Sequence, residues 1–185
     1  MRFNNFVKYI VAQTVKDKYS TVSDLAENIN GGWEVWLQVE IFMKLQNTDA
    51  GLLSFNREIP YGHQILRADF NFVPLNAQDV TTWVELKTER KSDVDKSIYE
   101  FIKDCKKVDD VQLNSENNSC GSVVVIPKNA NQVKSALNSY NYDHKNKFHY
   151  FLFGKDDNIG VSKSINDLPQ NIDNEKTMII YYIKE

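Results

Sequence analysis

Two carboxylates and a lysine occupy matching positions on two neighbouring predicted strands. Asp69 lies in an alternating segment, residues 64–73, and Glu85 and Lys87 lie in the next one, residues 80–87. Side chains alternate between the two faces of a strand, and in each segment the apolar side chains take the opposite face. If the two polar faces coincide, Asp69, Glu85 and Lys87 gather at one place.

This grouping predicts a catalytic metal site. Two carboxylates a few ångströms apart repel each other unless a cation lies between them. Hard oxygen ligands suit Mg²⁺ or Mn²⁺, and the backbone carbonyl of Leu86 is a plausible third ligand beside Asp69 and Glu85. A bound metal polarises a phosphate and lowers the pKa of a bound water. Lys87 would hold that water or stabilise charge developing on the phosphate, which is the layout of metal-assisted phosphodiester hydrolysis.

Glu40 is a further candidate catalytic and metal-binding acid. It lies in a predicted helix, residues 33–45, whose apolar residues cover most of the circumference, so we expect this helix to be buried on more than one side. A buried carboxylate is costly unless it is paired or bound to metal, and we therefore expect Glu40 to point at Asp69. A salt bridge to Arg57 or Arg67, or a rotation of the helix that brings Glu40 into water, stays open.

Three other residues are candidates for contact with nucleic acid. Gln38 precedes Glu40 and is expected to line the mouth of the site. Lys96 and Tyr99 lie in the first turns of a predicted helix, residues 93–108, and are expected to contact phosphates. The remaining charges on that helix alternate in sign, which is typical of a solvated face.

The predicted elements form an α/β fold. Their order is helices within 3–17 and 21–29, a helix at 33–45, strands at 52–59, 64–73 and 80–87, a helix at 93–108, a strand at 121–126, a helix at 131–140, and strands at 148–153 and 178–183. The three consecutive strands indicate an antiparallel meander, and the helix that follows indicates a crossover. We expect a mixed sheet with flanking helices, in which the apolar segment 121–126 is a central buried strand.

Asp69 followed by Glu85-Leu86-Lys87 on the next strand resembles the motif of the PD-(D/E)XK nuclease superfamily. The order of elements in residues 33–126 is similar to the restriction-endonuclease-like core of that family. The resemblance implies a Mg²⁺-dependent nuclease that cuts DNA or RNA, and Glu40 stands where the first core helix of many members adds a carboxylate. Ala68 replaces the proline of the written motif. An acid and a lysine separated by one residue occur four times in this chain, so the strand context, and not the tripeptide, carries the resemblance.

Three functional hypotheses remain open. The first is a metal-dependent nuclease, with DNA favoured over RNA as the identity of its substrate. The second is a non-catalytic protein of the same fold, acting as an inhibitor or interaction partner, and the third is an α/β interaction domain unrelated to nucleases. In the alternative to a nuclease site, Asp69, Glu85 and Lys87 form the exposed charged side of a half-solvated sheet. A cognate inhibitor or complex partner is conceivable for the nuclease, and the oligomeric state is open.

Length and composition set the outer bounds. The 185 residues fit a single domain, 1–185, with an N-terminal helical extension (1–31), a catalytic core (32–127) and a C-terminal αβ extension (128–185). The net charge of −3 argues against a non-specific nucleic-acid-coating protein, but not against a groove whose positive charge comes from metal ions. Without a signal peptide or an apolar run of about 18 residues, we expect a cytoplasmic protein with no membrane contact. Cys105 and Cys120 are expected to be reduced thiols, with a disulfide as the alternative.

Overall fold

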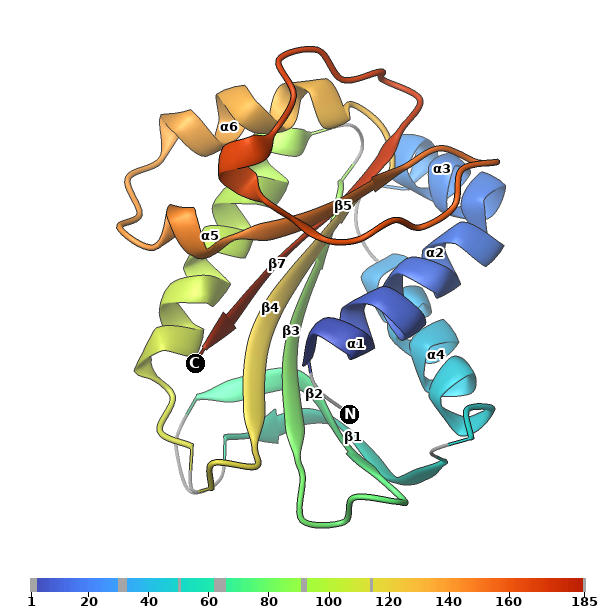
Figure 1. The fold of residues 1–185 in the computed structure, drawn as a ribbon, viewed down its shortest axis with the longest axis vertical. Helices are drawn as coiled ribbons and strands as arrows, with labels where there is room; N and C mark the ends of the chain where they lie inside the picture. The colour runs from blue at the N-terminus through green and yellow to red at the C-terminus, as the bar shows by residue number, and fades with distance from the viewer. Residues whose placement is uncertain are drawn as a thin grey trace.

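The computed structural model contains one seven-stranded sheet with helices on both faces (Figure 1). It describes residues 3–29, 33–49, 51–61, 66–90, 93–113 and 115–184. The strands are β1 (Leu52–Pro60), β2 (Arg67–Pro74), β3 (Thr82–Thr88), β4 (Ser119–Ile126), β5 (His149–Phe153), β6 (Lys163–Ser164) and β7 (Thr177–Lys184). Their order across the sheet is β1-β2-β3-β4-β7-β5-β6. The β3–β4 pair is parallel and the other pairs are antiparallel, which confirms the predicted mixed α/β sheet with its opening meander.

Each face of the sheet has its own layer of helices. One layer holds α1 (Phe3–Phe6), a π-helical turn η1 (Val7–Ala12), α2 (Gln13–Asp17), α3 (Tyr19–Asn28) and α4 (Trp33–Gln46), and the other holds α5 (Val94–Asp110) and α6 (Val133–Ser139). Short 3-10 turns are η2 (Ala130–Gln132), η3 (Lys145–Lys147) and η4 (Ile165–Asp167). Val123 and Val125 of β4 pack with the first layer, and Val124 and Ile126 with the second. The strand is therefore buried on both faces, as its apolar sequence predicted.

Helix α4 buries one face only. Trp33, Leu37, Ile41 and Leu45, spaced four residues apart, lie in the core, while Val35, Val39 and Met43 on the outer side are 46%, 50% and 50% exposed. The expectation that this helix is buried on more than one side is therefore wrong. Its first turn is anchored by the Trp33 indole, whose Nε1 donates to the Glu89 carbonyl at 2.7 Å. That bond places the start of α4 beside the end of β3.

Helix α5 is the crossover between the parallel strands β3 and β4. The Asp93 side chain caps it by accepting the Lys96 backbone N–H at 2.9 Å. An apolar stripe faces the sheet and is fully buried: Val94, Ile98, Phe101, Ile102, Cys105 and Val108. The helix of such a crossover packs back onto the sheet, and α5 contacts both β3 and β4.

Strands β2 and β3 separate at a fork. Their ladder runs from Phe72–Thr82 to Phe70–Val84. Beyond that point the Leu86 backbone N–H donates to the Asp69 carboxylate, Oδ2, at 2.7 Å. A side chain thus takes the place of a ladder bond, and the fork leaves room for polar groups inside the fold.

The two edges of the sheet are irregular or short. β6 comprises two residues. β1 is longer, but Glu58 has a left-handed backbone, φ 50°, and Pro60 ends the strand. A register irregularity also lies between Leu52 and Ser54.

Two further expectations concern the thiols and the membrane. Cys105 and Cys120 are buried free thiols, as predicted. Within the described ranges no helix combines the length and the apolar character that a membrane crossing requires.

Candidate metal centre

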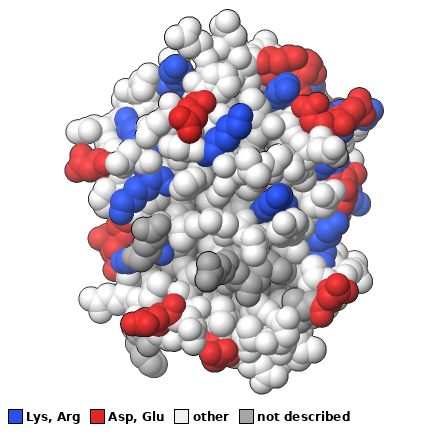
Figure 2. Space-filling view, in the orientation of Figure 1, with Lys and Arg blue, Asp and Glu red and all other residues white. Residues whose placement is uncertain are grey.

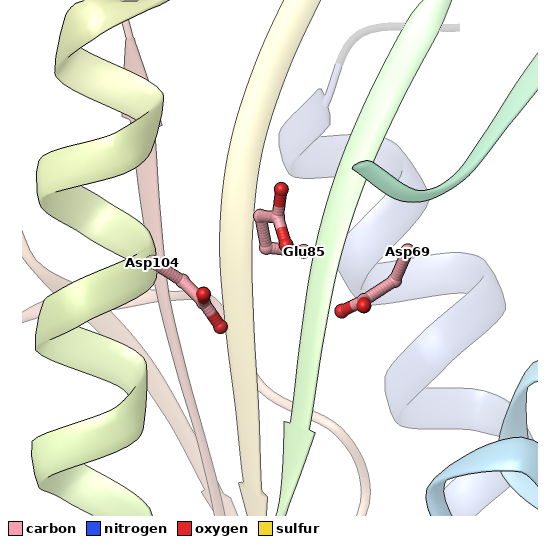
Figure 3. A group of neighbouring side chains, drawn as sticks. All are labelled: Asp69, Glu85 and Asp104. Atoms are coloured by element: carbon pink, nitrogen blue, oxygen red, sulfur yellow. The ribbon is translucent and has the colours of Figure 1, made fainter. Parts of the chain in front are cut away.

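Three carboxylates from three elements meet at the fork between β2 and β3. Asp69 comes from β2, Glu85 from β3 and Asp104 from α5, and Figure 3 shows the side chains converging around β3. One oxygen of each lies within 4.8 Å of the others. The predicted meeting of Asp69 and Glu85 is therefore confirmed, and Asp104 joins them as an acid that the sequence analysis had assigned to a solvated helix face.

The face that carries Glu85 is not an exposed side of the sheet. Glu85 is 1% exposed and its neighbour Trp83 is 9% exposed, because α5 covers this side of β3. The alternative of a half-solvated charged face is therefore wrong. Carboxylates in such a place need partners, since burying a charge without compensation is costly.

Lys87 supplies the first set of partners. Its Nζ lies 3.4 Å from Asp69 Oδ2, 3.3 Å from Asp104 Oδ2 and 3.6 Å from Glu34 Oε1. The Leu86 carbonyl also accepts from Lys87 Nζ at 3.2 Å. Lys87 and the Leu86 carbonyl, both predicted for this site, therefore lie within it.

Glu85 has partners of its own. Lys107 Nζ on α5 lies 2.7 Å from Glu85 Oε1, and the Tyr61 hydroxyl donates to the same oxygen. Lys107 also lies over the Tyr61 ring, 5.9 Å from its centre. Neither Tyr61 nor Lys107 lies in a sequence pattern that predicts it for the site.

The pKa values follow from burial and from crowding of like charges. Burial, followed by the charges of Asp104 and Asp69, raises the pKa of Glu85 to about 8. Burial likewise raises the pKa of Glu34 to about 7, against the attraction of Lys87. Burial raises the pKa of Asp104 as well. For Lys87 burial lowers the pKa, but the surrounding carboxylates outweigh it and leave the pKa above its ordinary value.

The cluster has more acids than bases. Four carboxylates face two ammonium groups, since Asp69, Glu85, Asp104 and Glu34 contact only Lys87 and Lys107 among the described lysines. The buried Asp104 Oδ2 atom, although 3.3 Å from Lys87 Nζ, has no hydrogen-bond partner in the described part of the chain. An excess of hard oxygen donors, one of them paired among the described residues with the Lys87 ammonium alone, fits a divalent cation such as Mg²⁺ or Mn²⁺.

Glu40 does not join this group. Its Oε2 lies 3.5 Å from Lys18 Nζ, in the helical layer away from the fork. Glu34 and Glu40 are six residues apart on α4, so their side chains leave the helix in directions about 120° apart. Because Glu34 faces the fork, Glu40 cannot point at Asp69, and that expectation is wrong. Glu34 is the acid that α4 contributes.

The predicted nucleic-acid contacts lie in different settings. Gln38 is 2% exposed and accepts from Arg57 Nε at 2.7 Å, so its predicted direct contact with a ligand is wrong. Lys96 and Tyr99 are exposed on α5, and the Tyr99 ring packs at 5.4 Å from that of Tyr140. Their contact with phosphates stays a prediction.

Comparison with known proteins adds no assignment. No family model, curated protein or solved structure matches this chain.

Proposed function

We propose that this protein is a metal-dependent nuclease that hydrolyses phosphodiester bonds of DNA, or of RNA, through a metal-activated water. The observation that carries the proposal is the group of oxygens from Asp69, Glu85 and Asp104, all within 4.8 Å of one another beside the Lys87 ammonium. Mg²⁺ or Mn²⁺ bound there would polarise the phosphate and lower the pKa of a bound water. A resemblance to the PD-(D/E)XK superfamily supports it, because the fork brings Asp69 next to Glu85-Leu86-Lys87.

Each residue of the site has a role in this proposal. Asp69, Glu85 and Asp104 would hold the cation, with the Leu86 carbonyl as a further oxygen ligand. The Leu86 N–H fixes the orientation of the Asp69 carboxylate at 2.7 Å. Lys87, once released from part of its ion pairing, would orient the attacking water and offset charge on the phosphate. Tyr61 and Lys107 would keep Glu85 in place.

The geometry also gives one argument for a non-catalytic protein of the same fold. Lys87 and Lys107 already pair with the carboxylates, so the cluster resembles a buried ion network that holds α4 and α5 on the sheet. In that case the molecule would act through its surface, as an inhibitor or interaction partner. On the face shown in Figure 2 basic and acidic side chains are interspersed, and neither sign dominates it.

A metal titration combined with a cleavage assay decides between the two. Calorimetry with Mg²⁺ and Mn²⁺ should show one binding event in the wild type and none in Asp69→Asn. Plasmid DNA and a structured RNA should be cut with Mg²⁺ or Mn²⁺ and not with EDTA, and Glu40→Gln should cut like the wild type. Metal binding without cleavage of either substrate would reject the nuclease. No metal binding in the wild type would leave the ion network as the better account.

A further inference from the structure

Three of the four arginines of this chain lie in or just after strands β1 to β3, of which β2 and β3 form the fork. The sequence has four, Arg2, Arg57, Arg67 and Arg90, and the last three fall between residues 57 and 90, the segment that builds β1 to β3. Within the described ranges none of these three has a carboxylate oxygen within 4.0 Å, whereas seven lysines do. Close ion pairs therefore do not account for the placement of these guanidinium groups, although Arg90 attracts a carboxylate of the cluster, Glu34, over a longer distance.

Arg57 is held by Gln38, one helical turn along α4 from Glu34 of the acid cluster. It is exposed on β1 and pairs with Phe70, the residue that follows Asp69. Its Nε donates to Gln38 Oε1 at 2.7 Å, and Gln38 is 2% exposed. Gln38 follows Glu34 on α4 by one turn of helix, which is about 6 Å along the axis. Glu34 in turn lies 3.6 Å from Lys87.

We infer that Arg57 binds a backbone phosphate of the nucleic-acid substrate, next to the phosphate that is cut, and that Gln38 is its positioning residue. The inference rests on the proposed nuclease function. With Nε bound to Gln38, the two terminal nitrogens of Arg57 have no partner in the described part of the chain. A guanidinium with its terminal donors free fits the oxygens of a phosphodiester in a bidentate manner, which an ammonium cannot do.

The buried glutamine makes this arrangement more than a surface charge. A flexible arginine loses side-chain entropy when it binds, and a partner that already restricts its rotamers reduces this loss. Gln38 presents its oxygen from the protein interior, so it cannot follow Arg57 into other positions. Contact between Arg57 and the nucleic-acid backbone gives no sequence preference, because phosphates are the same for every base.

The test is the salt dependence of binding. Fluorescently labelled duplex DNA, single-stranded DNA and RNA are each titrated with the protein at several salt concentrations. The buffer contains Ca²⁺ in place of Mg²⁺. Removing one phosphate contact lowers the slope of log K against log salt by about 0.9 on duplex and about 0.7 on single strands. Arg57→Ala should show this change on the preferred substrate, with about fivefold weaker binding at 0.15 M salt. Lys134→Ala, an exposed lysine of α6, should leave slope and affinity unchanged.

Two more variants test the role of Gln38. Gln38→Met removes the oxygen but keeps the length of the side chain, and it should weaken binding while leaving the salt slope near the wild-type value. Arg57→Lys keeps the charge but has no Nε, so Gln38→Met should have no further effect in that background. Thermal unfolding of each variant checks that the fold is intact.

The outcomes separate this inference from the proposed function. An unchanged salt slope in Arg57→Ala, with normal wild-type binding, overturns the role of Arg57 and leaves the nuclease proposal standing. If Gln38→Met weakens binding equally with arginine and with lysine at position 57, Gln38 is not a positioning residue for Arg57. A wild type that binds none of the three nucleic acids removes both the inference and the proposed function. Arg57→Ala should bind Mg²⁺ as the wild type does, because Arg57 lies outside the acid cluster.

Discussion

Glu85 and Glu89 leave the same segment four residues apart, and both are buried, but their surroundings differ. Glu89 is 0% exposed and accepts from two neutral donors, the Lys128 backbone N–H at 3.2 Å and Asn129 Nδ2 at 3.1 Å. Burial raises its pKa to about 7. Glu85 has a similar raised pKa, about 8, but two further carboxylates, Asp69 and Asp104, contribute to it.

The difference indicates which property sets the candidate site apart. Burial and a raised pKa are common to both glutamates, so neither property separates scaffold from site. Glu89 is one acid with amide donors on both oxygens, which is how a structural polar group is accommodated. Glu85 belongs to a group in which acids outnumber bases, and such an excess is stable only with protons or a cation. The surplus of carboxylates therefore distinguishes the site.

The largest effect should come from neutralising each glutamate in turn. Glu85→Gln should abolish metal binding and cleavage. The loss of metal affinity should exceed the roughly 10- to 100-fold that is typical when a residue that only supports a metal ligand is changed. Glu89→Gln should bind metal normally but lose about 1–3 kcal/mol of unfolding free energy, because its amide group faces other donors. Calorimetry and urea unfolding measure both. Equal metal affinity in the two variants would contradict the distinction drawn between them.

Lys87 should affect the chemical step more than binding. Lys87→Ala should still bind Mg²⁺ and nucleic acid but cleave about 10²- to 10³-fold more slowly, as expected for the loss of one charge-stabilising group. Lys87→Arg should not restore the rate fully, because the guanidinium is planar and wider than an ammonium. Single-turnover cleavage rates provide the measurement, with unfolding in Mg²⁺ as the control for the fold. Equal rates in wild type and Lys87→Ala would make Lys87 a purely structural cation.

Two glutamates of α4 form a matched pair. Glu34→Gln should lower the affinity for Mg²⁺ by about 10- to 100-fold, since Glu34 contacts Lys87 beside the proposed ligands. Glu40→Gln should leave it unchanged, because Glu40 pairs with Lys18. The comparison is made by calorimetry at one pH and one salt concentration. If Glu40→Gln alone reduced the affinity, α4 would present its other side to the metal.

The most gradual effect is the change of metal affinity with pH. The pKa of Glu85 in the folded protein, about 8, lies above its ordinary value of 4.5. Protonated Glu85 therefore stabilises the metal-free fold at low pH. This contribution to the unfolding free energy is lost as the pH rises from about 4.5 to about 8. A cation must displace that proton, so affinity should rise up to about tenfold per pH unit between pH 6 and 8. Calorimetry in two buffers of different ionisation enthalpy counts the protons released. A flat affinity across this range would mean that Glu85 is already ionised.

Part of this site could be predicted from the sequence because strands encode it locally. Alternation fixes the face of Asp69, Glu85 and Lys87, and short connections make their strands neighbours. The residues contributed by helices could not be placed in the same way. On α4 apolar residues cover most of the circumference, so periodicity does not fix the rotation of the helix. The sequence therefore pointed to Glu40, whereas the structure places Glu34 beside the cluster.

Asp104 was hidden for a related reason. It lies among lysines and acids that alternate along α5, a pattern that usually indicates a solvated face. One signal was available, because Asp104 follows Phe101 by three residues and precedes Val108 by four, and so borders the apolar stripe of α5. Whether such a border residue turns toward the sheet depends on the fork between β2 and β3, which only the folded chain reveals. The fold was predictable further than the site, since the mixed sheet follows from the order of elements.

The irregular backbone of β1 has a consequence for association between molecules. An open sheet edge offers unpaired N–H and C=O groups to any other extended chain, and a long regular edge is a starting point for aggregation. Here Glu58 turns the strand out of regular geometry, Pro60 lacks an N–H, and the opposite edge, β6, is two residues long. Both borders thus resist the addition of a further strand. The edge that bears Arg57 can therefore stay open to a ligand without also recruiting other copies of the chain.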